Sequence, residues 1–108
     1  MITYEDFAKL DIRIGKVVSA EKVPDADRLL RLMIDVAEDA PRQIMSAISE
    51  FYPEPSVLEG KLIPVLVNLE PKTFRGYESQ GMLVAADEDG TPILLHPEKE
   101  IPAGSPVK

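Results

Sequence analysis

The sequence predicts an all-β fold, a five-stranded Greek-key barrel with a short helix at the N-terminus and another between the third and fourth strands. Three observations predict it: short runs of alternating apolar and polar residues, frequent turn residues between these runs, and glycines where a strand must bend. With 108 residues, of which 44% are hydrophobic, the chain can build one modest core. We therefore expect one domain spanning residues 1–108.

The N-terminal segment predicts a short helix and then a curved strand. Thr3 and Asp6, three residues apart, form a weak capping box for a helix over Tyr4–Leu10. From Asp11 onward, apolar residues recur at every second position, which is the period of a half-buried strand. Gly15 interrupts this run and permits a bulge or a sharp bend.

The middle of the chain predicts three more strands. After a turn at 24–27, apolar residues alternate over 30–36, and we expect this strand to form a hairpin with the first. A third strand follows at Arg42–Ile48. Two prolines in 50–60 allow only a helical turn or two before the fourth strand at 61–69.

The last third predicts a further hairpin and an extended tail. Pro64 cannot donate a backbone hydrogen bond, so it indicates an edge or a bulge within the fourth strand. Two short apolar runs, 82–86 and 92–95, flank the turn 87–90, whose glycine suits a positive φ. Residues 98–108 are rich in proline and predict an extended tail.

These elements fit a small oligonucleotide/oligosaccharide-binding (OB) barrel, in which short strands curl around one core. An SH3-like barrel or a small sandwich also contains short strands and frequent turns, so the pattern alone leaves all three open.

The charge of the chain is acidic but unevenly distributed. The net charge is −7, which argues against the basic surface of a typical nucleic-acid-binding protein. Both ends of the chain are acidic, whereas the middle is nearly neutral. Because exposed charges are screened over about 8 Å at physiological salt, a local basic patch can still act there. The bases that could share one face are Arg28, Arg31, Arg42, Lys61, Lys72 and Arg75.

Several classes of function find no support in the sequence. The chain has no cysteine, and His96, its one histidine, has no partner at metal-ligand spacing, so we expect no metal or cofactor and interpret His96 as structural. No nucleophile, nucleotide-binding or phosphate-binding motif is present, which predicts a protein that is not an enzyme by itself. The acidic N-terminus and the absence of a long apolar stretch favour a cytoplasmic protein without a membrane partner.

The segment 68–86, NLEPKTFRGYESQGMLVAA, is the strongest indication of function. A run of apolar residues breaks into a polar, basic, glycine-punctuated turn and then resumes. Packing alone does not require this choice of residues, whereas a loop on a rigid scaffold can present them together as a recognition surface.

Six motifs across almost the whole chain resemble those of a known family. They are FAKLDIRIGKVV (Phe7–Val18), PDADRL (Pro24–Leu29), IDV (Ile34–Val36), RQIMSAI (Arg42–Ile48), NLEP (Asn68–Pro71) and RGYESQGMLVAA (Arg75–Ala86). In this order and spacing they are similar to the tRNA-binding OB domain appended to methionyl-tRNA synthetases. The same domain occurs in free-standing tRNA-binding proteins and in the polypeptide related to endothelial monocyte-activating polypeptide II.

Two positions depart from this resemblance. Ala37 and Ala47 stand where the family commonly has glycine. A sister branch of the family, the CsaA-type secretion chaperones, also tends to place alanine after the serine of the third strand. Binding of unfolded polypeptides is therefore the alternative function, although RGYESQGM is similar to the tRNA-binding branch.

The resemblance makes Arg75 the first candidate for contact with tRNA. Its planar guanidinium can hold a phosphate through two parallel hydrogen bonds, and Gly76 allows close approach of the backbone. On residue type alone, an ion pair with Glu70 or Glu78 is the commoner role for a loop arginine.

The other candidates have structural alternatives. Asn68 could read a base or ribose or bond its own loop, and Ser79 could contact tRNA or serve as a turn hydroxyl. Lys72 is a candidate phosphate contact, whereas Met82 is expected to pack beneath the loop as support. The complete set of candidate tRNA-binding residues is Arg75, Lys72, Asn68, Ser79, Arg28, Arg42 and Met82.

The resemblance also implies partners. The chain is similar in extent to the free-standing members, which are expected as homodimers, with Tyr4, Phe51, Tyr52 or the tail as candidates for the symmetric contact. The implied function is non-catalytic binding of structured tRNA through its backbone and shape, which would assist a methionyl-tRNA synthetase.

Overall fold

The structure is a computed structural model that describes residues 1–108. Its elements are α1 (Tyr4–Ala8), β1 (Ile12–Lys22), β2 (Leu30–Asp35), β3 (Arg42–Ser46), η1 (Ser49–Phe51), η2 (Pro55–Leu58), β4 (Leu62–Leu66), β5 (Lys72–Phe74), β6 (Tyr77–Ser79), β7 (Met82–Leu83), β8 (Ala85–Glu88), β9 (Thr91–Leu94) and β10 (Pro106–Val107). The elements η1 and η2 are short 3-10 helices.

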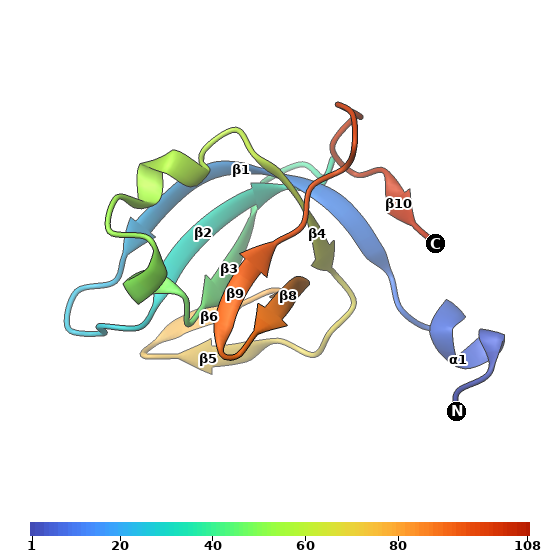
Figure 1. Cartoon of the computed structure of the whole chain (residues 1–108), viewed down its shortest axis with the longest axis horizontal. Coiled ribbons are helices and arrows are strands. Elements are labelled where there is room, and N and C mark those ends of the chain that lie inside the picture. The colour runs from blue at the N-terminus through green and yellow to red at the C-terminus, as the bar shows by residue number, and fades with distance from the viewer.

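The main sheet is antiparallel, with the strand order β3-β2-β1-β4-β7 and with β10 added beside β1. Strands β3 and β7, at the two ends of this order, pack against each other and nearly close the sheet. The hairpins β5–β6 and β8–β9 lie outside it, as Figure 1 shows. The fold is an OB-like barrel, which confirms the predicted Greek-key arrangement.

The core of the barrel follows the alternation seen in β2. Leu30, Leu32 and Ile34 are completely buried, and the residues between them are partly exposed. Residues from β1, β3 and β4 complete the same cluster, and Leu58 of η2 covers one opening of the barrel. Strand β4 is buried over most of its length, as its continuous apolar sequence predicts.

The first strand bends, but for a different reason from the one predicted at Gly15. The register between β1 and β2 shifts between Val17 and Ser19, so the irregularity lies beyond the glycine. A β-carbon at Gly15 would lie 2.4 Å from Cγ2 of Ile34. The glycine is therefore required by close packing inside the barrel rather than by a bulge.

Local signals predicted the start of α1, whereas the edge or bulge predicted at Pro64 is not formed, because β4 lies between β1 and β7 and pairs with β1 in an unbroken register. Thr3 and Asp6 form both hydrogen bonds of the capping box, although the helix ends at Ala8 and buries none of its residues. Pro64 faces Ile14 at a position where the backbone N–H and C=O of Ile14 bond Ser105 and Gly104 instead. The missing N–H of Pro64 therefore removes no hydrogen bond between β1 and β4.

Candidate functional site

The segment 68–86 contains a two-stranded hairpin, where the sequence predicted a polar turn. Strands β5 and β6 pair from Lys72 with Ser79 to Phe74 with Tyr77, and two residues join them. Arg75 and Gly76 in this turn have φ values of 51° and 85°. Positive φ at both positions marks a type I′ turn, which follows the right-handed twist of the strands. The hairpin escaped prediction because each strand has only three residues and little apolar alternation.

Arg75 and Lys72 lie on this hairpin without acidic partners. Both side chains are exposed, and neither forms an ion pair, so the alternative pairing of Arg75 with Glu70 or Glu78 is not formed. The Lys72 ammonium lies 5.1 Å from the centroid of the Phe74 ring, within range of a cation–π contact. Arg75 stands at the tip, where its guanidinium can approach a ligand.

The turn between β1 and β2 lies at the same end of the molecule. Val23 and Leu29 of this turn pack with Met45 of β3 in a small apolar cluster, and Phe74 and Tyr77 of the hairpin pack against it. Arg28, in the same turn, is exposed and forms no ion pair. We call this region, the turn 23–29 together with β5–β6, the hairpin end.

Arg31 of β2 lies against the hairpin end, but its charge is shared. Its guanidinium lies 5.9 Å from the centroid of the Tyr77 ring and bonds Gln43 and Glu21, at 2.7 and 2.8 Å. Lys61 does not join this group. It lies beside η2, where its backbone bonds Val17 and Leu58.

Ser79 is buried, with 4% of its surface exposed. Its hydroxyl accepts a hydrogen bond from the Met45 amide and donates one to the Gly81 carbonyl, both at 3.0 Å. This position corresponds to the structural alternative for Ser79 and leaves the hydroxyl no free surface for tRNA. A β-carbon at Gly81 would lie 2.6 Å from the Leu66 carbonyl oxygen, so this glycine is structural too.

Met82 does not support the loop from below, contrary to the prediction. It is 48% exposed, whereas its neighbour Leu83 packs against the core. Successive strand residues point to opposite faces, so burial of Leu83 turns Met82 outward. Its thioether is therefore available on the surface.

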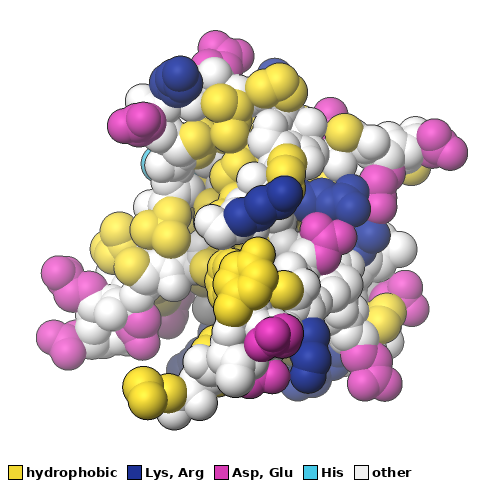
Figure 2. All heavy atoms as spheres, turned by 90° about the vertical axis from the view of Figure 1, so that its right-hand side faces the viewer, with side chains coloured by type: hydrophobic (Ala, Val, Ile, Leu, Met, Phe, Trp, Pro, Cys, Tyr) yellow, Lys and Arg dark blue, Asp and Glu magenta, His cyan; other side chains and the backbone are white.

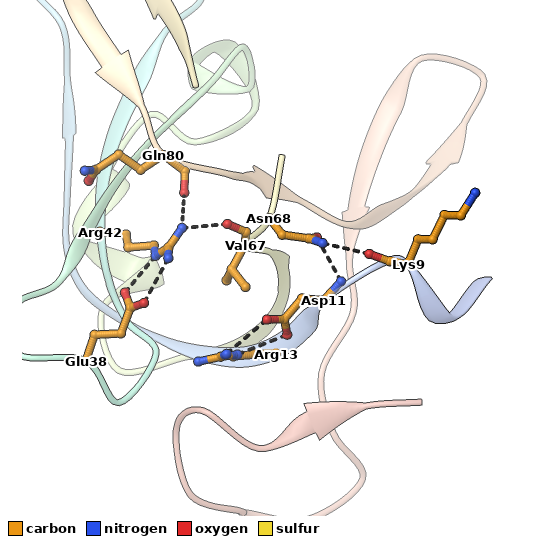
Figure 3. A network of polar contacts seen from close by, with 8 residues as sticks. All are labelled: Lys9, Asp11, Arg13, Glu38, Arg42, Val67, Asn68 and Gln80. Atoms are coloured by element: carbon orange, nitrogen blue, oxygen red, sulfur yellow. Dashed lines mark hydrogen bonds and ion pairs between the residues drawn. The ribbon is translucent and has the colours of Figure 1, made fainter. Parts of the chain in front are cut away.

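Asn68 joins the end of β4 to the N-terminal segment. Its side-chain amide donates to the Lys9 carbonyl at 2.7 Å, and its oxygen accepts from the Asp11 amide at 2.8 Å. Figure 3 shows the side chain lying between these two backbone groups. The structural role differs from the one expected, because the bonded backbone belongs to the segment after α1 rather than to the loop of Asn68 itself.

Arg42, a candidate for the basic face and for tRNA contact, is partly buried and bonded within the chain. Its guanidinium makes a two-pronged ion pair with Glu38, at 2.7 and 2.8 Å, and donates to the carbonyls of Val67 and Gln80, at 2.7 and 2.9 Å. The hydrogen bond from Arg42 lowers the pKa of the Glu38 carboxyl, and the same pairing raises the pKa of Arg42. Sequence reasoning missed Glu38, since nothing local indicates the conformation of the loop between β2 and β3.

At one of the two departures from the family pattern, the backbone adopts a conformation that favours glycine. Ala37, where glycine is common, has a φ of 66°, and its amide donates to the Asp35 carboxylate at 2.8 Å. Glycine adopts this backbone conformation without strain. Ala47 lies exposed after β3.

The opposite end of the molecule exposes several apolar side chains. A hollow of about 400 Å³ lies between α1 and β10 and is lined by Tyr4, Phe7 and Val107, among others. Tyr4 is 77% exposed, and Leu10 is exposed beside it. Figure 2 shows hydrophobic side chains gathered on this face among charged ones. We call this region, α1 together with β10, the terminal end.

Other functional groups are sparse. The Nδ1 atom of His96 lies 2.7 Å from the Leu62 carbonyl oxygen, which accounts for its position. No three potential metal ligands lie together. None of the helices has the length and hydrophobicity that crossing a membrane requires.

Comparisons with known proteins agree with this geometry. A family described as "Putative tRNA binding domain" matches residues 12–106. The chain is 54% identical over 106 residues to the methionine–tRNA ligase of Archaeoglobus fulgidus, a match that covers 98% of this chain but 16% of that protein.

Two solved structures have nearly the same extent as this chain. The MetRS related protein from Pyrococcus horikoshii has a TM-score of 0.91 at 38% identity, with coverage of 100% of this chain and 98% of that one. The chaperone CsaA from Bacillus anthracis str. Ames has a TM-score of 0.87 at 36% identity, with coverage of 100% and 99%.

Proposed function

The chain belongs to the family of putative tRNA-binding domains, and on this premise we propose that it is a non-catalytic module that binds folded tRNA through its hairpin end. Arg75, Lys72 and Arg28 would supply the charge and contact phosphates. Recognition would rest on the tRNA backbone and shape rather than on a base sequence, as is usual for structured RNA.

The observation that carries this proposal is the position of Arg75. A type I′ turn favours asparagine, aspartate or glycine at its first central position, because these residues tolerate a positive φ. An arginine at φ 51° costs backbone energy there, yet its side chain has no acidic partner that compensates. Strained residues cluster at functional sites, which supports a role for this guanidinium outside the chain.

The distribution of charge supports the same surface. Of the cations at the hairpin end, Arg28, Lys72 and Arg75 are exposed and form no ion pair. At the terminal end, Lys9 pairs with Asp6 and Arg13 with Asp11. The hairpin end also carries Asp25, Asp27 and Glu78, so its three cations are balanced in number by three carboxylates. The unpaired cations can still act locally in a protein of net charge −7, because distant exposed charges are screened.

The relatives suggest the setting in which such a module acts. The curated relative is a methionine–tRNA ligase, and the chain matches 16% of its length. We therefore infer that the module retains tRNA for a methionyl-tRNA synthetase in the cytoplasm, without contributing a catalytic group.

The terminal end fits a second copy of the chain better than it fits RNA. Its exposed apolar side chains, with Tyr4 and Leu10 foremost, surround the hollow between α1 and β10. A homodimer would cover this surface and present two hairpin ends to tRNA. Sedimentation velocity should show a dimer that Tyr4→Glu converts to monomer. Val57→Glu, an equally apolar-to-acidic change on the exposed face of η2, should leave the dimer intact.

Direct binding measurements test the main proposal. Fluorescence anisotropy with labelled tRNA at increasing salt should give a log affinity that falls with log salt, with a slope of about −2 to −4 for roughly three to five phosphates. An absence of binding at low salt would contradict the proposal.

Binding of unfolded polypeptides is the second candidate, favoured by the similarity to chaperone CsaA over the whole chain. The exposed apolar residues provide a surface for it. Binding of an unfolded apolar peptide with little salt dependence, together with no tRNA binding, would establish this function in place of the first.

A further inference from the structure

The β5–β6 hairpin is attached to β3 in an unusual way. Strand β3 ends the main sheet, and its outer edge faces β6. The amide of Gln43 donates to the side-chain oxygen of Gln80 at 3.0 Å, and the amide of Met45 donates to the Ser79 hydroxyl at 3.0 Å. In the other direction, the Gln80 amide donates to the Gln43 carbonyl at 2.8 Å. Side chains therefore replace backbone carbonyls in much of this contact.

Arg42 closes this attachment at the point where the chain leaves the hairpin. One of its terminal nitrogens donates to two carbonyls, that of Gln80 after β6 and that of Val67 after β4. The rest of the guanidinium is held by both carboxylate oxygens of Glu38. Figure 3 shows Arg42 between these three groups, so that one side chain links the loop before β3, the end of β4 and the end of the hairpin.

These contacts leave Arg42 little capacity to bind a ligand. A guanidinium has five N–H groups, and the hydrogen bonds to Glu38, Val67 and Gln80 occupy most of them. The side chain is also mostly covered, with 24% exposed. To hold a phosphate through two hydrogen bonds, Arg42 would have to give up at least one of these contacts.

We propose that Arg42, oriented by Glu38, is a positioning residue that fixes the β5–β6 hairpin for tRNA binding and does not contact tRNA itself. This inference rests on the proposed function. The orientation of the hairpin sets where Arg75 and Lys72 stand, and a group held in its bound geometry loses less freedom on binding. A loose hairpin would spread the same charges over many positions.

Glu38→Gln separates positioning from direct contact, because the two roles predict opposite signs. Removal of a carboxylate strengthens RNA binding if only charge matters, and the release of Arg42 to a phosphate would also steepen the salt dependence. If Glu38 orients Arg42 so that it holds the hairpin, removal of the Glu38 carboxylate weakens tRNA binding by about fivefold with an unchanged salt slope. Asp39→Asn removes a neighbouring exposed carboxylate that forms no ion pair and is the matched control, with unchanged or slightly stronger binding.

Arg42→Lys provides a second test that keeps the charge. Lysine cannot reproduce the fork that holds Glu38 and both carbonyls, so tRNA affinity should fall about tenfold while the salt slope stays that of the wild type. Hydrogen exchange gives an independent readout. The Gln80 amide should exchange faster in both variants, whereas the Ile63 amide, in the core and paired with β1, should keep its protection.

The outcomes distinguish this inference from the proposed function. If the wild type fails to bind tRNA at low salt, both are overturned. If the wild type binds and Glu38→Gln binds equally or more tightly, only the positioning role is overturned. A smaller salt slope in Arg42→Lys, or faster exchange throughout the core, would also contradict it. Weaker binding, an unchanged slope and local exchange at the hairpin would establish it.

Discussion

Two hairpins of this chain share one turn geometry and carry opposite charges. The β5–β6 turn has Arg75 and Gly76 at φ values of 51° and 85°, and the β8–β9 turn has Asp89 and Gly90 at 49° and 89°. In β8–β9 the residues suit the turn, since aspartate tolerates a positive φ and the Asp87 carboxylate accepts the Gly90 amide at 2.7 Å.

In β5–β6, the arginine suits the turn poorly, and no acidic residue pairs with it. The backbone therefore requires a positive φ at both central positions of each turn. Only the β8–β9 turn has a residue that favours it at the first position. The comparison teaches that the proposed recognition surface is better supported by the unfavourable turn residue at Arg75 than it is opposed by the overall acidity of the chain.

The largest expected effect on stability is at Gly81, where the chain leaves the β5–β6 hairpin. Gly81→Ala would place a β-carbon 2.6 Å from the Leu66 carbonyl at a φ of 145°, so we expect a loss of about 3 kcal/mol in the free energy of unfolding. Gly76→Ala is the control, because its φ of 85° is unfavourable but the surrounding space is open, and it should cost about 1 kcal/mol. Urea unfolding measures both. Equal losses would show that close packing at Gly81 is unimportant.

Replacement of Arg75 by a favoured turn residue should separate stability from function. Arg75→Asn relieves backbone strain, so we expect the melting temperature to rise by a few degrees, equivalent to at most about 1 kcal/mol. The affinity for tRNA should nevertheless fall about tenfold, as a phosphate contact is lost. Asp89→Asn in the other hairpin should change neither quantity appreciably. If Arg75→Asn gains stability and keeps its affinity for tRNA, the strained arginine has no role in binding tRNA.

Asn68 tests how far the recognition surface extends. Asn68→Ala removes two hydrogen bonds to the segment after α1 and should cost about 1 kcal/mol of stability. Because the side chain is occupied inside the chain, the salt slope for tRNA binding should not change. A loss of tRNA affinity without a loss of stability would return Asn68 to the role of a direct contact.

The smallest expected effect is the pH dependence of the Arg42–Glu38 ion pair, which lies next to the β5–β6 hairpin. Arg42 lowers the pKa of Glu38 in the folded protein, so the unfolded chain takes up this proton first as the pH falls. The stabilisation of the folded protein by ionised Glu38 is therefore complete above the usual glutamate pKa of about 4.3. It is lost as the pH falls through the lowered pKa of Glu38 in the folded protein.

For a partly exposed pair, we expect a difference of at most about 1 kcal/mol between the wild type and Glu38→Gln at pH 7. This difference should shrink at acid pH in urea unfolding experiments. A difference that persists unchanged below pH 3 or so would exclude an ionic contribution.

The sequence predicted the parts of the fold that depend on neighbouring residues. The capping box of α1, the alternation of β2 and the β8–β9 turn are all local, and each is present in the structure. The hairpin β5–β6 was missed, because strands of three residues leave almost no periodic signal.

The candidate site was predicted less completely, for the same physical reason. The charge of Arg75 and Lys72 could be read from the sequence, whereas the backbone groups that bond Asn68 and Arg42 lie 25 to 59 residues away. Met82 was assigned to the wrong face, because a strand of two residues does not indicate which side is buried.

A reciprocal change of charge in the two hairpins tests the central claim most directly. Arg75→Asp and Asp89→Arg alter the net charge equally and in opposite directions. We predict that Arg75→Asp weakens tRNA binding by at least about tenfold and reduces the salt slope by about one, whereas Asp89→Arg changes the affinity by less than about twofold. Equal and opposite changes in affinity for the two variants, or no loss with Arg75→Asp, would contradict the claim that the β5–β6 hairpin is the binding surface.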